Sequence, residues 1–204
     1  MRRLWVLIGL LLPLAAGCTT VNLTIGGDPS RAGEPRCRAA HTQRREESRS
    51  GLLLMAQSVR SASLLPCIDA LPVGWTFAGL DVTNRRARFW LSSDRDGEKA
   101  VRVSVSKSCD TRHAVQSASG RTGLRRYDRV QPVGSGYQAD RYFVFASGCI
   151  TYHFALRGHT GSEPATAVSS GLNFVTRAAL ARSVTDYSDG RLKLDPTPAA
   201  SGSK

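Results

Sequence analysis

The stretch from Arg86 to Ser106, RARFWLSSDRDGEKAVRVSVS, decides the fold that we predict for this chain. Two segments with alternating apolar and polar residues, 86–91 and 100–105, flank a polar turn, a pattern typical of a β-hairpin. Because successive side chains of a strand point to opposite faces, one face of this hairpin is apolar. That face carries Ala87, Phe89, Leu91, Val101, Val103 and Val105. The opposite face carries Arg86, Arg88, Trp90, Arg102 and Ser104, and we expect it to lie in water.

Similar patterns on both sides of the hairpin extend the predicted sheet. We expect strands at 75–82 and 125–130, and a second hairpin formed by 138–145 and 150–156. The segment 52–59 has the length of a strand or of a short buried helix, and periodicity does not separate the two. Residues 67–71, between two prolines, are expected to form a connection.

A helix pattern follows the predicted sheet. Ser162 is a candidate N-cap, and the apolar residues of the pattern then recur at helical steps. These residues are Val168, Leu172, Val175 and Ala179. The sequence therefore predicts a disulfide-stapled α+β domain, with an antiparallel sheet of about five or six strands packed by a C-terminal helix.

The N-terminal sequence is typical of an export signal. Met1-Arg2-Arg3 precedes an apolar run of roughly 11 residues and the small residues Ala15-Ala16-Gly17, which end at Cys18. Over about 20 residues this segment resembles the signal of bacterial lipoproteins, whose lipobox ends in a small residue before the lipid-bearing cysteine. The resemblance implies that Cys18 carries fatty-acyl chains such as palmitate and anchors the protein at the extracytoplasmic face of the cell membrane. Ala15 stands where the family usually has leucine, and an ordinary cleaved secretory signal is the alternative.

Composition along the chain predicts four segments. We expect a signal peptide at 1–17, a polar tether at 18–50, one globular domain at 51–184 and a disordered tail at 185–204. The fractions of 41% hydrophobic and 22% charged residues are typical of a globular protein.

Four cysteines follow Cys18, namely Cys37, Cys67, Cys109 and Cys149. An even number in an exported chain indicates two disulfides, and four cysteines allow three pairings. We favour Cys37–Cys67 and Cys109–Cys149, because the partners are neighbours in sequence order. The spacings contain no Cys-x-x-Cys, so we expect no metal site and no cofactor.

The chain is strongly basic, with a formal net charge of +12. Anionic lipid headgroups and wall polymers are therefore candidate partners, whereas nucleic acid is not expected. The candidate anion-binding face is the wet face of the first hairpin, with Arg86, Arg88, Trp90 and Arg102, and as an extension we consider Arg125, Arg126 and Arg129. Two alternatives stay open: a solvated face whose arginine stems cover Trp90, and a charge that only reflects an arginine-rich composition.

No catalytic motif stands out. The sequence has no Gly-x-Ser-x-Gly, no His-Glu-x-x-His and no phosphate-binding Gly-rich loop. His153 and His159 follow Asp140 and could form a triad with Ser135 or Ser162. We therefore predict a non-enzymatic binding or interaction module of the cell envelope, which contacts the membrane through its anchor and unknown envelope proteins. The alternatives are a surface hydrolase that uses His153 or His159, and a binder of anionic lipid or wall polymer.

Overall fold

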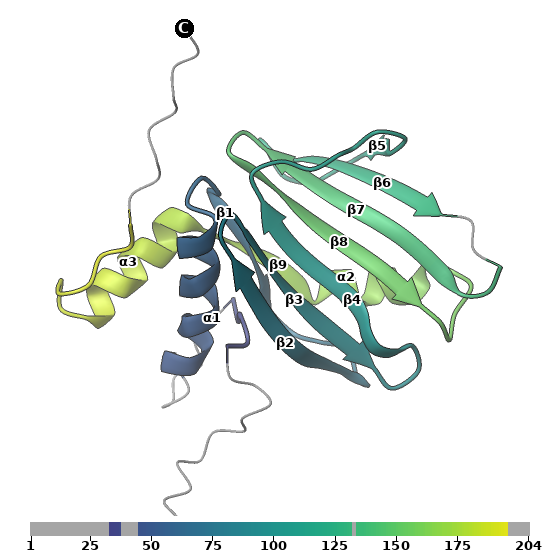
Figure 1. Cartoon of the computed structure of the whole chain (residues 1–204), viewed down its shortest axis with the longest axis horizontal. Helices are drawn as coiled ribbons and strands as arrows, with labels where there is room; N and C mark the ends of the chain where they lie inside the picture. The colour runs from purple at the N-terminus through teal and green to yellow at the C-terminus, as the bar shows by residue number, and fades with distance from the viewer. Residues whose placement is uncertain (1–32, 38–44, 132–133, 196–204) are drawn as a thin grey trace, which may run out of the picture.

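The main sheet has seven antiparallel strands in the order β2-β3-β4-β8-β7-β6-β5 (Figure 1). The computed structural model describes residues 33–37, 45–131 and 134–195, so the predicted signal and Cys18 lie outside the described residues. The strands are β2 (Trp75–Thr83), β3 (Arg86–Ser93), β4 (Gly97–Ser106), β5 (Val115–Ser117), β6 (Arg125–Gln131), β7 (Tyr137–Phe145) and β8 (Gly148–Leu156). The α+β class and both predicted hairpins are confirmed, and the sheet is larger than the five or six strands expected.

A second sheet has two antiparallel strands, β1 (Leu64–Ile68) and β9 (Leu172–Thr176). The prediction of a connection at 67–71 was wrong at its start, because β1 runs through Pro66 to Ile68. Pro66 is tolerated since a proline has no N–H to donate and a two-stranded sheet consists of edge strands. Pro66 lies opposite Phe174 in the register.

The predicted helix after Ser162 is two helices with β9 between them. They are α2 (Glu163–Ser170) and α3 (Arg177–Tyr187). Gly171 ends α2 at a close approach of the backbone, where a Cβ atom would overlap the carbonyl oxygen of Ala70. The amide of Asp69 donates to the carbonyl of Gly171 over 2.9 Å, so the chain leaves the helix to pair with β1.

Helix α1 (Arg45–Ser58) settles the ambiguity of segment 52–59 in favour of a helix. It contacts β2 and β3, and the β1–β9 ribbon contacts β4 and β8, so both cover the same face of the main sheet, here called the inner face (Figure 1). Helix α3 packs against β9 and α1. Helix α1 begins before the predicted domain start at 51, and α3 ends after the predicted domain end at 184. In the described part of the chain, no helix is long and apolar enough to cross a membrane.

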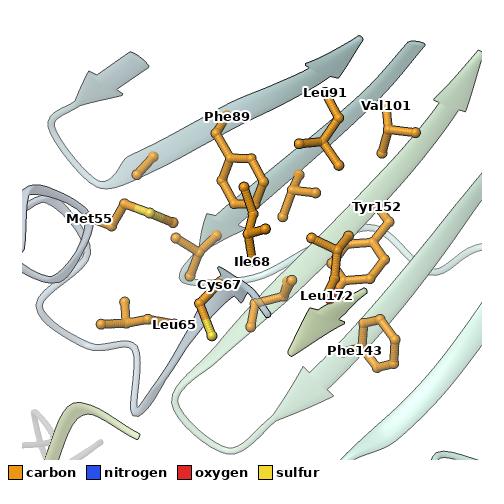
Figure 2. Close-up of a cluster of buried hydrophobic side chains, with 14 of the residues drawn as sticks. Met55, Leu65, Cys67, Ile68, Phe89, Leu91, Val101, Phe143, Tyr152 and Leu172 are labelled. Atoms are coloured by element: carbon orange, nitrogen blue, oxygen red, sulfur yellow. The ribbon is translucent and has the colours of Figure 1, made fainter. Parts of the chain in front are cut away.

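The core lies between the inner face and its covering elements. All six predicted apolar residues of the first hairpin, from Ala87 to Val105, have 0% exposure. Figure 2 shows Met55 of α1 and Leu65 of β1 in one cluster of buried side chains with Phe89 of the main sheet. The ring centroids of Phe143 and Tyr152 lie 5.1 Å apart. The alternation of side chains along the strands therefore places the core where the sequence predicted it.

Both predicted disulfides are present. Cys37–Cys67 joins the segment 33–37 to β1, with Cα atoms 5.0 Å apart. Cys109–Cys149 joins the β4–β5 connection to β8, with Cα atoms 5.8 Å apart. The predicted tail begins inside α3, and the carbonyl of Asp195 accepts a hydrogen bond from Arg177 over 2.8 Å.

Candidate functional site: the outer face of the sheet

The face of the main sheet opposite the core is here called the outer face, and a row of functional groups crosses its middle. In the register each residue of the row lies opposite the next, on five adjacent strands. This central row consists of Trp90, Arg102, His153, Asp140 and Arg129. It brings the predicted anion-binding residues Trp90 and Arg102 next to His153 and Asp140, which the sequence suggested for a different function.

Trp90 lies between two cations. The Cζ atom of Arg88 and the Nζ atom of Lys99 each lie 5.2 Å from the centroid of the Trp90 ring. Arg88 also donates from Nε to Asp81 Oδ2 over 2.8 Å. The charge of Arg88 is thus compensated inside the molecule, and its guanidinium helps to cover Trp90.

Arg86 and Arg102 differ from Arg88. Both are exposed, and neither side chain forms a hydrogen bond or ion pair with any residue that the structure describes. Since Arg102 lies at the centre of the sheet on the face away from the core, its five N–H donors are directed to solvent or to a ligand. The predicted anion-binding face therefore contains one paired arginine, Arg88, and two arginines, Arg86 and Arg102, without a side-chain partner among the described residues.

The three arginines of the predicted extension, Arg125, Arg126 and Arg129, also differ in their positions and partners. Arg125 is exposed, lies on the outer face and has no ion-pair partner within the described residues. Arg129 belongs to the central row. The placement of Arg126 on this face was wrong, because alternation along β6 turns it inward, opposite the core residue Phe143, where Nε lies 2.8 Å from Asp128 Oδ2.

Asp140 is the most buried member of the central row, with 6% exposure. Its carboxylate accepts hydrogen bonds from Arg129 Nη2 over 2.7 Å and from Gln131 Nε2 over 3.1 Å, and His153 Nδ1 lies 2.7 Å from its other oxygen. Burial by itself would raise the pKa of Asp140, but the bonds from His153 and Arg129 outweigh it and hold this pKa well below its usual range. Because the carboxylate is ionised, it can only accept, so Nδ1 of His153 is the donor and Nε2 is left for another partner.

Tyr142 lies beside this cluster, under the guanidinium of Arg129, whose Cζ is 5.5 Å from the ring centroid. Burial and the negative charge of Asp140 raise the pKa of Tyr142 to about 12. The main chain of the β4–β5 connection also reaches this region, where the carbonyl of Arg112 accepts from Arg129 Nη1 over 3.4 Å. The loop held by Cys109–Cys149 thus packs on one end of the outer face.

His159 belongs to a separate place in the fold. Its Nδ1 lies 2.9 Å from Asp96 Oδ1, and the side chain of Asp96 is only 1% exposed. Asp96 also accepts from the amide of Gly158 over 3.0 Å and from Ser93 Oγ over 3.1 Å. These contacts tie the β3–β4 turn to the segment after β8.

The predicted triads are not assembled. Within the described ranges, neither Ser135 nor Ser162 forms a hydrogen bond with His153 or His159; each imidazole instead lies against a carboxylate. Ser135 lies in the turn that precedes β7, and Ser162 precedes α2. What the structure brings together is therefore an aspartate-histidine pair beside arginines, without a positioned hydroxyl nucleophile in the described region.

A second polar cluster, which no local sequence pattern indicates, lies on the inner face. Arg141 Nε donates to Asp128 Oδ1 over 2.8 Å, and Arg141 Nη1 donates to Ser169 Oγ of α2 over 2.9 Å. Burial raises the pKa of Asp128, but the hydrogen bonds from Arg141 and Ser117 and the adjacent guanidinium of Arg126 lower it below its ordinary value overall. This cluster fixes α2 to β7.

Compared with known proteins, the chain matches no protein-family model, no curated protein and no solved structure.

Proposed function

We propose that this chain is a lipid-anchored protein of the cell envelope, whose domain acts as a non-enzymatic binding module at the extracytoplasmic membrane surface. The proposed anchor is Cys18, at the end of the lipoprotein-like signal. Two disulfides in one small domain support export, because paired cysteines persist in oxidising compartments.

The proposed binding surface is the outer face of the sheet. The observation that carries the proposal is the position of Arg102, which is exposed and unpaired among the described residues, between Trp90 and His153 in the central row. Helix α1 and the β1–β9 ribbon cover the inner face, whereas Arg102 in the middle of the outer face is exposed. A guanidinium in this position binds carboxylate, sulfate or phosphate groups through parallel N–H donors.

The chemistry of the face favours an anionic polymer over a lipid bilayer. The exposed large apolar residues of the described chain are Leu54, Val73, Val115, Val130, Tyr187 and Leu192. None of them belongs to the central row, and Trp90 is half-buried between cations instead of projecting outward. A membrane-inserting surface would present apolar side chains toward the lipid.

The test uses the full chain with Cys18→Ser, so that no acyl chain contributes, and compares dextran sulfate with uncharged dextran. We expect saturable binding to dextran sulfate only, and this binding should weaken as salt screens the charges. Arg102→Gln should weaken it about tenfold, the loss expected for one charge-assisted hydrogen-bonding group. Arg182→Gln is the matched control, because Arg182 is exposed on α3 and lies away from this face.

Equal affinities of the two variants would overturn the assignment of the outer face. Stronger binding to phosphatidylglycerol vesicles than to dextran sulfate would replace the polymer with anionic lipid as the partner.

The contact between His153 and Asp140 supports a second candidate function, a surface hydrolase. A carboxylate on Nδ1 leaves Nε2 of His153 positioned as a general base. A screen with chromogenic ester, phosphoester and glycoside substrates tests this candidate. Activity that His153→Gln abolishes and His159→Gln preserves would favour the enzyme over the binding module.

A further inference from the structure

A hollow lies at the end of the main sheet where the β2–β3 turn meets the end of β4. Arg86 and Ser106 lie opposite each other in the register, which brings these two segments together. Figure 1 shows the end of β2, the start of β3 and the end of β4 at the same end of the sheet. This turn hollow is lined by Thr83, Asn84, Arg85, Arg86, Ser106, Lys107 and Ser108.

The turn hollow concentrates positive charge without compensation. Arg85, Arg86 and Lys107 line it, and no acidic residue does. None of these three side chains has an ion pair or hydrogen bond to a residue in the described part of the chain, and all three are exposed. Arg112, in the β4–β5 connection, is by contrast paired with Asp110.

The backbone around the turn hollow is held in place. The amide of Arg85 donates to the carbonyl of Ser58 over 3.0 Å, and Ser58 Oγ donates to the carbonyl of Arg86 over 3.0 Å, so the end of α1 fixes the turn. Across the hollow, Ser106 Oγ donates to the carbonyl of Ser108 over 2.8 Å. The backbone that carries these side chains is thus fixed before a ligand binds, so binding does not have to order the loop itself.

Arg85 occupies this turn at a conformational cost. Its φ is 72°, in the left-handed region that glycine and asparagine adopt more readily than arginine. Glycine would give the turn a more favourable backbone but would remove one of the three cations. Arg85→Gly therefore removes a cation from the hollow without straining the turn, and the experiment below uses this substitution.

We infer that the turn hollow binds a phosphate group through Arg85, Arg86 and Lys107. Phosphate is tetrahedral and carries several acceptor oxygens and up to two negative charges, which suits two guanidinium groups, one ammonium group and the amide of Asn84. The phosphate can be free in solution or belong to a lipid headgroup, since the hollow is open at the surface. This inference is independent of polymer binding by the central row, although Arg86 borders both surfaces.

The experiment measures phosphate binding by the full chain with Cys18→Ser, using amide NMR shifts and calorimetry, with sodium chloride of equal ionic strength as the reference. We expect saturable shifts at 84–86 and 106–108. Arg85→Gly and Lys107→Gln should each weaken binding about tenfold, as for a lost charge-assisted contact, and Arg182→Gln should leave it unchanged. Arg85→Gly should unfold at the same denaturant concentration or a higher one, so a loss of binding would not reflect a loss of fold.

Vesicles distinguish the two sources of phosphate. The lipid headgroup is identified if the protein binds phosphatidic acid vesicles but not phosphatidylcholine vesicles, and if Lys107→Gln weakens this binding. Binding of inorganic phosphate alone would identify the free ion. The inference is overturned if neither probe binds, or if both variants bind as tightly as the parent protein. Arg102→Gln should not change phosphate binding, so the result stands apart from the dextran sulfate test.

Discussion

Replacement of Asp140 by alanine tests whether the central row stabilises the sheet as well as carrying the proposed binding surface. The Asp140 side chain is 8% exposed, and its carboxylate oxygens lie 2.7 Å from His153 Nδ1 and from Arg129 Nη2. Removal of one partner from a buried ionic cluster costs about 3–5 kcal/mol. Since the side chains of Arg129 and His153 are 30% and 23% exposed and can regain water, we expect the low end, about 3 kcal/mol.

Urea denaturation monitored by tryptophan fluorescence measures this loss, and Asp186→Ala on the exposed side of α3 is the control. For a domain of this size, 1 kcal/mol corresponds to roughly 2–4 °C in Tm, so Asp140→Ala should melt about 6–12 °C below the parent protein. The control should stay within about 0.5 kcal/mol. A loss below about 1 kcal/mol for Asp140→Ala would refute the view that the row is a tight ionic cluster.

The same contacts predict a pH dependence. The pKa of Asp140 is lower in the folded than in the unfolded protein, so on acidification the unfolded chain takes up this proton first. The stabilisation by Asp140 is therefore complete above the unfolded pKa of about 3.9 and is lost as the pH falls further. The difference in unfolding free energy between the parent protein and Asp140→Ala should shrink below about pH 4. A difference that stays constant down to pH 2 would contradict the cause given for the low pKa.

Three further variants, one of them a double substitution, test the fold. Cys109→Ser with Cys149→Ser should lower the unfolding free energy by about 4 kcal/mol in urea titrations, the chain-entropy value for a loop of this length; an unchanged midpoint would argue against the pairing. Gly171→Ala should cost more than about 2 kcal/mol, because its Cβ would overlap the carbonyl of Ala70; a wild-type Tm would contradict the close approach. Phe89→Ala should cost about 3–5 kcal/mol by leaving a cavity in the core, and hydrogen exchange of β3 and β4 amides should accelerate accordingly.

The hairpins could be predicted because each depends on a pattern of residues that are close together in the sequence. Alternation with a period of two placed Phe89 and Val103 on one face and Arg102 on the other, and the structure has the same arrangement. The disulfide pairing followed from sequence order once export was assumed. The β1–β9 ribbon could not be predicted in this way, because its two strands are short and lie about a hundred residues apart. Pro66 gives β1 the pattern of a loop, and β9, which follows Gly171, continues the apolar spacing of a helix.

The central row could be predicted only in part. Trp90 and Arg102 belong to one hairpin, as do Asp140 and His153, so each pair follows from local alternation. Their meeting depends on the pairing of β4 with β8, which joins two hairpins that a long connection separates, and no local signal specifies such a pairing. Alternation along β6 separates Arg126 from Arg125 and Arg129, because it turns every second side chain toward the core.

The central claim is that the outer face of the sheet, with Arg102 at its centre, is the surface that binds an anionic partner. The most direct measurement is an amide NMR titration of the full chain, carrying Cys18→Ser, with dextran sulfate. We predict that the largest shifts fall on β3, β4 and β8 around Trp90, Arg102 and His153, and that α1 and α3 stay unchanged. Shifts centred on α1 or α3, or shifts that Arg102→Gln leaves intact, would contradict the claim.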